Sequence, residues 1–194
     1  MLPDLKDVER VVAIDPGSQC TGIAIFDYWP LLEAPHWRLH SALSVQIKPL
    51  DDVLKMATSV QREVGKINER TQIAIEYPEE QKYRKEFIRQ NDIILLAHTT
   101  GLILSRLEPD PRRVSRIPPK EWKGGVPKPG ATRRKKRGPR PYIIERRCRR
   151  LLGPEELDKI LLPTATRRHT DVWDAIGLGL WSVHRCRMGC IPHD

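Results

Sequence analysis

Acidic residues stand at the ends of apolar segments at three widely separated places in this chain. Asp15 closes the segment VVAID, and Glu76 closes QIAIE, two apolar runs that are typical of buried strands. Asp171 and Asp174 open DVWDAIGLGLW, an apolar stretch of helical period. A buried carboxylate is costly unless it is paired or bound to a metal. We therefore expect a fold that brings these acids together around a divalent metal ion.

The remaining pattern predicts a three-layer α/β fold with a mixed sheet, in the order βββαβαβα. Strands are expected at about residues 10–15, 21–26, 37–47, 72–76 and 113–117. Helices are expected after Asp51 and Asp52, over about 82–107, from Pro141 to Gly153, and over about 171–185. With 194 residues and no repeats, the chain is expected to form a single domain.

Two of these helices have a predicted buried stripe. The first carries apolar residues at spacings of three and four, namely Val53, Ala57, Val60, Val64 and Ile67. The stripe expected on the second consists of Phe87, Asn91, Leu95, His98 and Leu102. His98 would then be a half-buried, hydrogen-bonded residue.

The positive charge of the chain is concentrated in one segment. The net charge is +9, and residues 128–150 hold eleven basic residues and one acid, so that this segment carries +10 and the rest −1. Such a tract is typical of a nucleic-acid-binding protein, although a solvated tail or a localisation signal has the same composition. Its place between two predicted core elements favours nucleic acid. Residues 124–140, rich in Gly, Pro, Lys and Arg, are expected to form a flexible basic loop.

The acidic residues have the geometry of a metal site if the first and fourth strands are parallel neighbours. Asp15 and Glu76 would then end adjacent strands, which lie about 4.8 Å apart. Asp171 and Asp174 are three residues apart and project from one helix face, with Thr170 as the expected N-cap. Oxygen-only ligands suit Mg²⁺ or Mn²⁺, and two such ions can drive phosphodiester hydrolysis.

Each acid also has a purely structural interpretation. An Asp before Pro-Gly is often a turn residue, and an Asp in the first turn of a helix is often a capping acid. Glu76 fits neither pattern, because Glu is rarely buried without a partner. The combination of all four acids at element ends favours the metal site.

In these motifs the chain resembles the RuvC-type Holliday-junction resolvases, which have an RNase H-like fold. IDPGSQCTG is similar to the first-strand motif of that family, IAIE to its fourth-strand motif, and DVWDAIGLGLW to its C-terminal helix. VSRIPPKEWKGGVPK is similar to its fifth strand and the lysine-bearing segment that follows. The resemblance spans about residues 10–185 in the same order.

The resemblance implies an RNase H-like fold with a mixed five-stranded sheet flanked by helices. It also implies a homodimeric endonuclease that uses Mg²⁺, with Mn²⁺ as a substitute and two ions per site, to nick a four-way DNA junction symmetrically. Asp15, Glu76, Asp171 and Asp174 would be the catalytic metal ligands, and Lys123 a basic residue near them. The compact length and the long basic loop resemble viral and phage members more than cellular ones.

The residues expected to contact DNA are the basic side chains in and before the loop: Lys120, Lys123, Lys128, Arg133, Arg134, Lys135, Lys136, Arg137 and Arg140. Trp122 is expected to be a buried anchor under the loop, with stacking on an unpaired base as the alternative. His169 is expected in a solvent-facing loop, with a role in orienting water as its alternative.

Other functions are less favoured by the sequence. An actin- or sugar-kinase-like ATPase would need a second domain and a second glycine-rich loop, and a catalytically idle DNA-binding module would lack at least one of the acids. A nuclease that cuts RNA–DNA hybrids or other branched nucleic acid stays open, because only the resemblance favours the junction. A zinc site formed by His184, Cys186, Cys190 and His193 does not have the spacing of a standard finger.

The expected location is the cytoplasm, or the host-cell cytoplasm for a phage protein. No apolar run approaches the length that spans a bilayer, so no membrane association is expected. The N-terminus has acidic residues where a secretory signal would be apolar, and the four cysteines have no disulfide-framework spacing.

Overall fold

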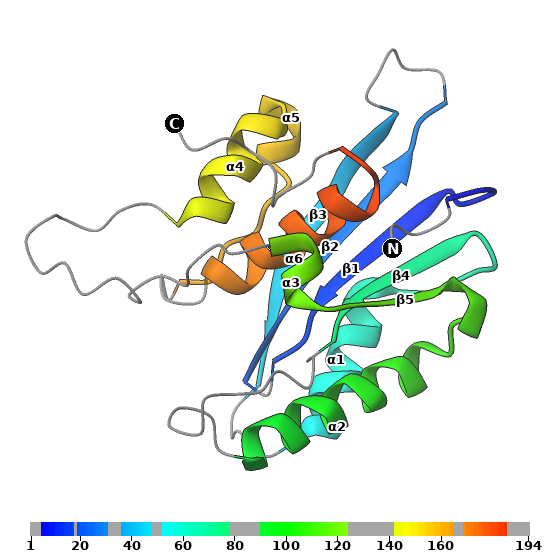
Figure 1. The fold of residues 1–194 in the computed structure, drawn as a ribbon, viewed down its shortest axis with the longest axis vertical. Coiled ribbons are helices and arrows are strands. Elements are labelled where there is room, and N and C mark those ends of the chain that lie inside the picture. Colours follow the sequence, from blue (N-terminus) through cyan, green and yellow to red (C-terminus); the bar gives the residue numbers. More distant parts are fainter. Residues whose placement is uncertain are drawn as a thin grey trace, which may run out of the picture.

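The structure is a computed structural model that describes residues 5–17, 19–30, 36–47, 52–77, 90–123, 142–164 and 169–185. Five strands form one mixed sheet in the order β3-β2-β1-β4-β5 (Figure 1). The strands are β1 (Arg10–Asp15), β2 (Cys20–Tyr28), β3 (Trp37–Gln46), β4 (Thr71–Glu76) and β5 (Val114–Ile117). All five lie where the sequence pattern predicts strands.

β1 is the central strand of the sheet. β1 is antiparallel to β2 and parallel to β4, while β3 extends the sheet beside β2 and β5 extends it beside β4. The three-stranded meander followed by parallel strands, with helices on both faces, is the RNase H-like three-layer α/β fold. The predicted fold class is therefore confirmed.

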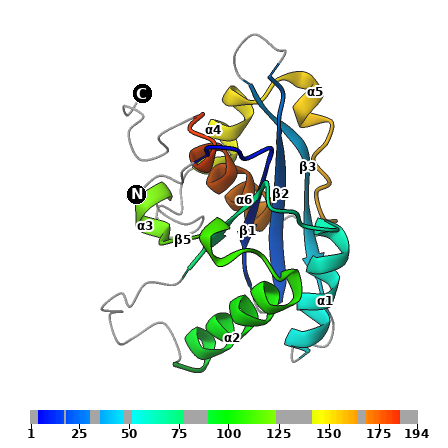
Figure 2. The same cartoon turned by 90° about the vertical axis from the view of Figure 1, so that its right-hand side faces the viewer.

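Helices cover both faces of the sheet (Figure 2). One face is covered by α1 (Val53–Val64) and α2 (Gln90–Leu107), and the other by α3 (Pro119–Lys123), α4 (Ile143–Leu151) and α6 (His169–Ser182). A 3₁₀ turn, η1 (Pro111–Arg113), precedes β5, and the short helix α5 (Pro154–Leu157) packs beside β3.

Strand alternation divides the core into two clusters and decides which face receives the acids. Val12 and Ile14 point toward α1 and α2, whereas Val11 and Ala13 point toward α6. By the same alternation, Asp15 belongs to the α6 face of the sheet. Glu76 follows Ala74 on β4 and belongs to that face as well.

Several helix details differ from the sequence-based expectation. α6 begins at His169 and ends at Ser182, so Thr170 lies inside its first turn and is not the N-cap. α1 ends at Val64 because Gly65, with φ +74°, turns the chain, which leaves Ile67 beyond the helix. Gly153 does follow the end of α4, but it also precedes α5, which the pattern did not predict.

Within the described part of α2, the predicted stripe is right at Leu102, which packs against the core, and wrong at His98. His98 is exposed, and the buried positions are Thr99, Thr100, Ile103 and Leu107. The helix is apolar around most of its circumference, so its sequence does not define which side faces the sheet. Residues 82–89 of the predicted helix lie outside the described residues.

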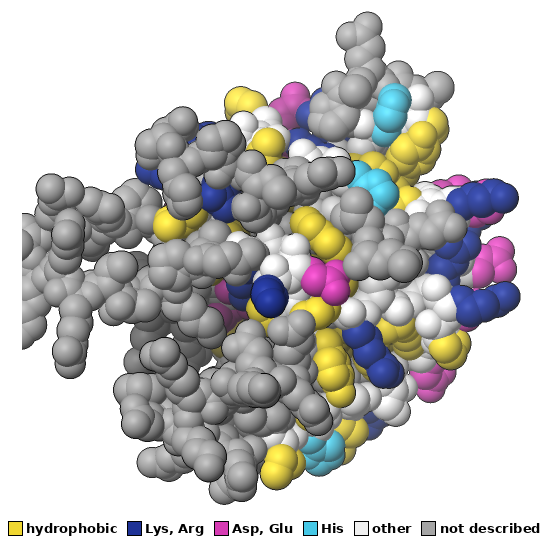
Figure 3. Space-filling view, viewed as in Figure 1, with side chains coloured by type: hydrophobic (Ala, Val, Ile, Leu, Met, Phe, Trp, Pro, Cys, Tyr) yellow, Lys and Arg dark blue, Asp and Glu magenta, His cyan; other side chains and the backbone are white. Residues whose placement is uncertain are grey.

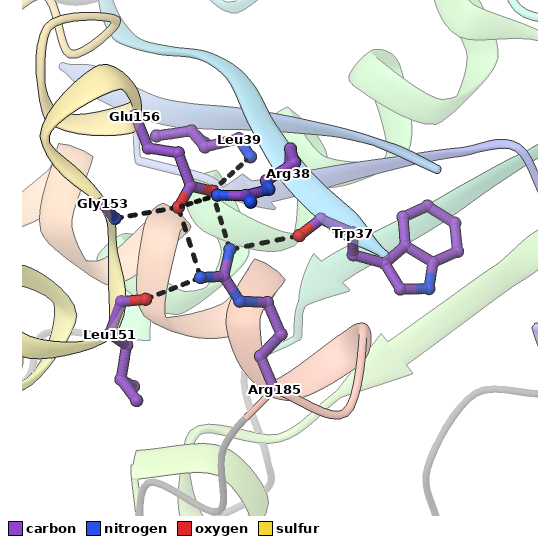
Figure 4. Close-up of polar contacts among 7 residues, drawn as sticks. All are labelled: Trp37, Arg38, Leu39, Leu151, Gly153, Glu156 and Arg185. Carbon is purple, nitrogen blue, oxygen red and sulfur yellow. Dashed lines mark hydrogen bonds and ion pairs between the residues drawn. The ribbon is translucent and has the colours of Figure 1, made fainter. Parts of the chain in front are cut away.

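A buried ion pair fixes the chain just beyond α6 to the edge of the sheet (Figure 4). Glu156 is 2% exposed and accepts hydrogen bonds from the Arg185 guanidinium, at 2.7 and 3.2 Å, and from two backbone N–H groups. Those N–H groups belong to Leu39 on β3, at 2.7 Å, and Gly153, at 3.0 Å. Arg185 also donates to the carbonyl of Leu151 at 2.6 Å. Every charge of the pair is thus matched, as a buried pair requires.

Among the described residues, no helix is both long and apolar enough to cross a membrane.

Candidate active site

Asp15 and Glu76 are the last residues of neighbouring parallel strands. In the β1–β4 ladder Ile14 pairs with Ile75, so the two acids follow side by side. Both belong to the α6 face of the sheet, for the reason of alternation given above. The sheet therefore places Asp15 and Glu76 side by side, as the sequence predicts.

A glycine lets the acidic end of α6 approach these strand ends. Gly22 on β2 pairs with Asp15, and a Cβ atom added to Gly22 would lie 2.0 Å from the backbone carbonyl oxygen of Asp171. No side chain fits in that space, so the first turn of α6 rests directly on the β2 backbone. Asp174, one turn further along, is 7% exposed and faces the ends of β1 and β4.

Lys123 lies among these carboxylates. Its ammonium nitrogen Nζ is 2.9 Å from Glu76 Oε2 and 2.9 Å from Asp174 Oδ2, and the residue is only 9% exposed. The preceding residue, Trp122, is fully buried and donates its indole N–H to the same oxygen, Glu76 Oε2, at 2.9 Å. Trp122 is buried, as expected, whereas the loop it was expected to anchor lies outside the described residues. Its contact with Glu76 is an unpredicted feature of the site.

Tyr142 completes the contacts of Asp174. Its phenolic O–H donates to Asp174 Oδ1 at 2.5 Å, so that the two carboxylate oxygens of Asp174 bind Tyr142 and Lys123 separately. Sequence reasoning missed Tyr142. The available signal was its position at the start of a core-facing helix, where a buried tyrosine hydroxyl needs a polar partner.

The electrostatics of the site follow from burial and like charge. Burial raises the pKa of Asp15 well above its ordinary value, and the charge of Glu76 raises it further, while Lys123 acts in the opposite direction. For Lys123, burial alone would lower the pKa, but the charges of Asp15, Asp174 and Glu76 outweigh burial and raise it. The Lys123 ammonium is thus held in its charged form by the acids around it.

The donors at this site fit a hard divalent cation in their chemistry. They are carboxylate oxygens, which Mg²⁺ and Mn²⁺ prefer, and two of them already contact one cationic nitrogen. In the structure Lys123 bridges two of these carboxylates, and the described residues include no group of three Asp, Glu, His or Cys side chains placed to hold a metal ion. Asp15, Glu76, Asp171 and Asp174 remain the side chains whose chemistry would suit such an ion.

The other predicted site residues fall into two groups. Lys120 is exposed on α3, and His169, which begins α6, lies 2.8 Å from the Pro163 carbonyl and is not in a solvent-facing loop. Lys123, also predicted to contact DNA, is 9% exposed and paired with the acids. The predicted DNA contacts from Lys128 to Arg140 and the basic loop at 124–140 lie outside the described residues, as do Cys186, Cys190 and His193.

A separate cleft of about 900 Å³ lies at the opposite end of β1, near Arg10. Its lining includes the Arg10–Asp27 ion pair and the half-exposed Trp29. It shares no residue with the carboxylate site. Elsewhere on the surface, Figure 3 shows acidic and basic side chains interspersed along the right-hand edge of the visible face.

Comparisons with known proteins give matches only at the level of structure. No family model matches the sequence, and a search of curated proteins finds no match. Similar solved structures include a Thermus thermophilus RuvC structure, with 14% identity, a TM-score of 0.48, and coverage of 91% of this chain and 96% of that chain. Another is T. thermophilus RuvC in complex with Holliday junction substrate, with 14% identity, a TM-score of 0.49, and coverage of 89% and 94%. At this identity the likeness concerns the fold alone.

Proposed function

We propose that this chain is a metal-dependent endonuclease that resolves four-way DNA junctions by symmetric nicking. The nuclease part of the proposal rests on one observation. Glu76 and Asp174 both contact the ammonium group of Lys123, beside Asp15, at the ends of the central strands. The junction as substrate rests on the resemblance of the sequence motifs. In this proposal the chain is one RNase H-like nuclease domain in a cytoplasmic homodimer, which supplies one site for each nicked strand.

The bound ions would supply an activated water and stabilise the leaving oxygen, so that one P–O bond forms as another breaks. The chain's own residues hold the carboxylates in place for that reaction. Trp122 donates to Glu76, and Tyr142 donates to Asp174, so both carboxylates have a fixed orientation before any substrate arrives. α6 and β1 are packed elements, which favours a precise site.

The basic tract supplies the attraction for DNA. Its described portion is α4, which presents Arg146, Arg149 and Arg150 to solvent and packs on α6 through Ile144 and Cys148. The helix begins beside Tyr142, and hence beside the carboxylates. Guanidinium groups along this helix suit phosphates of a duplex arm that enters the site.

The test is Mg²⁺-dependent cleavage of a synthetic four-way junction, compared with linear duplex and an RNA–DNA hybrid. Asp174→Asn should keep the fold and junction binding but lower cleavage about a thousandfold, because about 4 kcal/mol of metal-borne stabilisation is lost. Paired symmetric nicks in the junction alone would support the proposal. Cleavage of the hybrid instead would leave a nuclease with another substrate, and wild-type cleavage by Asp174→Asn would remove the carboxylate assignment.

A further inference from the structure

Lys123 contacts two of the carboxylates that are candidate metal ligands, Glu76 and Asp174. Its Nζ is 2.9 Å from one oxygen of each carboxylate, and it also lies 4.7 Å from the centre of the Trp122 ring. The nitrogen is therefore held from three sides by groups that attract a cation. Lys123 is also the final residue of α3, whose Trp122 is fixed in the core, so its backbone position is set by packing.

In the metal-free protein, the positive charge of Lys123 offsets the negative charge of the neighbouring carboxylates. Glu76 and Asp174 both lie 2.9 Å from the same nitrogen atom, and carboxylates this close to one another repel when no cation is present. The Lys123 ammonium, 2.9 Å from one oxygen of each of these carboxylates, opposes that repulsion. Lys123 therefore stabilises the folded chain before any metal binds.

A divalent ion and this ammonium cannot occupy the same place. Mg²⁺ would take carboxylate oxygens as ligands at about 2.0–2.1 Å, and one oxygen each of Glu76 and Asp174 is already in contact with Lys123 Nζ at 2.9 Å. A divalent ion and the Lys123 ammonium at contact distance in a buried site would also repel each other strongly. Binding of the ion thus requires the lysine side chain to leave both carboxylates.

We propose that Lys123 is the resident counter-ion of the metal-free site, and that it competes with the divalent ion for Glu76 and Asp174. This inference rests on the proposed function, because it takes these carboxylates as metal ligands. It follows that Lys123 has opposite effects on stability and on metal affinity. The lysine keeps the site folded without metal, and it weakens metal binding by having to be displaced.

Metal titration of two matched lysine variants tests the competition. Lys123→Met and Lys120→Met each remove one positive charge from α3, but only Lys123 contacts the carboxylates, whereas Lys120 is exposed. Mn²⁺ binding is measured by calorimetry without DNA. We expect Lys123→Met to bind Mn²⁺ at least tenfold more tightly than the wild type, and Lys120→Met to change the affinity less than threefold. Equal or weaker binding by Lys123→Met would overturn the proposal.

A measurement on the wild-type protein covers the case in which Lys123→Met fails to fold. Reductive methylation followed by mass spectrometry reports the reactivity of each lysine amine, with Lys120 as an internal reference in the same helix. Saturating Mg²⁺ should raise the methylation rate of Lys123 several-fold and leave that of Lys120 unchanged. An unchanged rate at Lys123, in protein shown by calorimetry to bind the metal, would overturn the competition.

The outcomes separate this inference from the proposed function. If the wild type binds metal and cleaves the junction while Lys123 stays unreactive, only the inference fails. If the competition is observed but no junction is cleaved, the inference stands and the proposed substrate fails. If neither the wild type nor Lys123→Met binds Mn²⁺, the metal site and the inference fail together.

Discussion

The Asp174 carboxylate joins two elements of the candidate active site to α6. Its two oxygens bind side chains from different elements, Lys123 of α3 and Tyr142 at the start of α4. Trp122 and Lys123 similarly share one oxygen of Glu76. Each carboxylate is therefore oriented by groups outside its own strand or helix, which is how a buried acid keeps a single rotamer.

Glu156 gives a prediction at the scale of a single residue. Burial would raise its pKa, but the hydrogen bonds from Arg185, Leu39 N–H and Gly153 N–H outweigh burial and lower it. A carboxyl group with a lowered pKa in the folded state stabilises the protein above its unfolded pKa of 4.5, and this contribution is lost as the pH falls through the folded pKa. The protein should therefore lose stability in acid below about pH 4.5.

Urea unfolding of Glu156→Gln measures this contribution. At pH 7 we expect a loss of about 3 kcal/mol, because the buried Arg185 charge loses its partner. The difference from the wild type should shrink below pH 4.5. Glu155→Gln is the matched control, since Glu155 is the exposed neighbour on the same short helix and should change stability by less than about 0.5 kcal/mol. Equal effects of the two variants would show that the buried pair contributes nothing.

At the scale of elements, the contact between α6 and β2 sets the position of the acids. Gly22→Ala would place a methyl group 2.0 Å from the Asp171 carbonyl oxygen and 3.2 Å from the Ala175 Cβ. Backbone must shift to relieve the first contact, which should cost about 1–3 kcal/mol and move Asp171 and Asp174 away from β1. Thermal unfolding and junction cleavage should therefore both be impaired.

Gly101→Ala on α2 provides the control of opposite sign. A Cβ atom at Gly101 meets nothing within 4 Å, and alanine is the better helix former. This variant should gain about 0.5–1 kcal/mol in stability and keep wild-type cleavage. If Gly22→Ala behaved like Gly101→Ala, the close approach of α6 to β2 would not be needed for the site.

The sequence predicts the strands and the two strand-end acids because these depend on local pattern. Asp15 and Glu76 follow apolar runs, and alternation alone puts them on the same face once β1 and β4 are neighbours. The place of Lys123 near the acids follows from the motif resemblance and not from local pattern. Its contacts, and that of Tyr142 with Asp174, depend on how short helices pack. For α2 the reverse problem arises, since an all-round apolar helix offers several equally good faces and His98 was assigned to the wrong one.

At the scale of the whole molecule, the two faces of the sheet differ in the residues and charges they carry. The α1–α2 side is built around an aliphatic cluster that includes Val12, Ile14 and Met56 and holds none of the candidate site acids. The opposite side carries the acids, α4 and the described part of the basic tract. DNA affinity should therefore depend on arginines of the α4 side and not on those of the α1 side.

Salt dependence of junction binding measures this asymmetry. The double variant Arg146→Gln/Arg150→Gln on α4 should weaken binding and reduce the slope of log Kd against log salt by up to about 1.8, or about 0.9 per lost phosphate contact. Arg62→Gln/Lys66→Gln, at exposed positions on α1 and just beyond its end, removes the same charge from the other layer. Fluorescence anisotropy in Ca²⁺ gives both slopes, and the same slope for both variants would contradict a DNA-binding side.

Lys123 and Tyr142 flank residues 124–141 in the sequence, yet their side chains contact the same carboxylate of Asp174. The two anchor points of that stretch are therefore neighbours in space, whatever number of residues joins them. For protein engineering, changes in the length of the sequence between Lys123 and Tyr142 should therefore cost little, because the entropy of closing a chain segment rises by only about 0.6 kcal/mol for each doubling of its length.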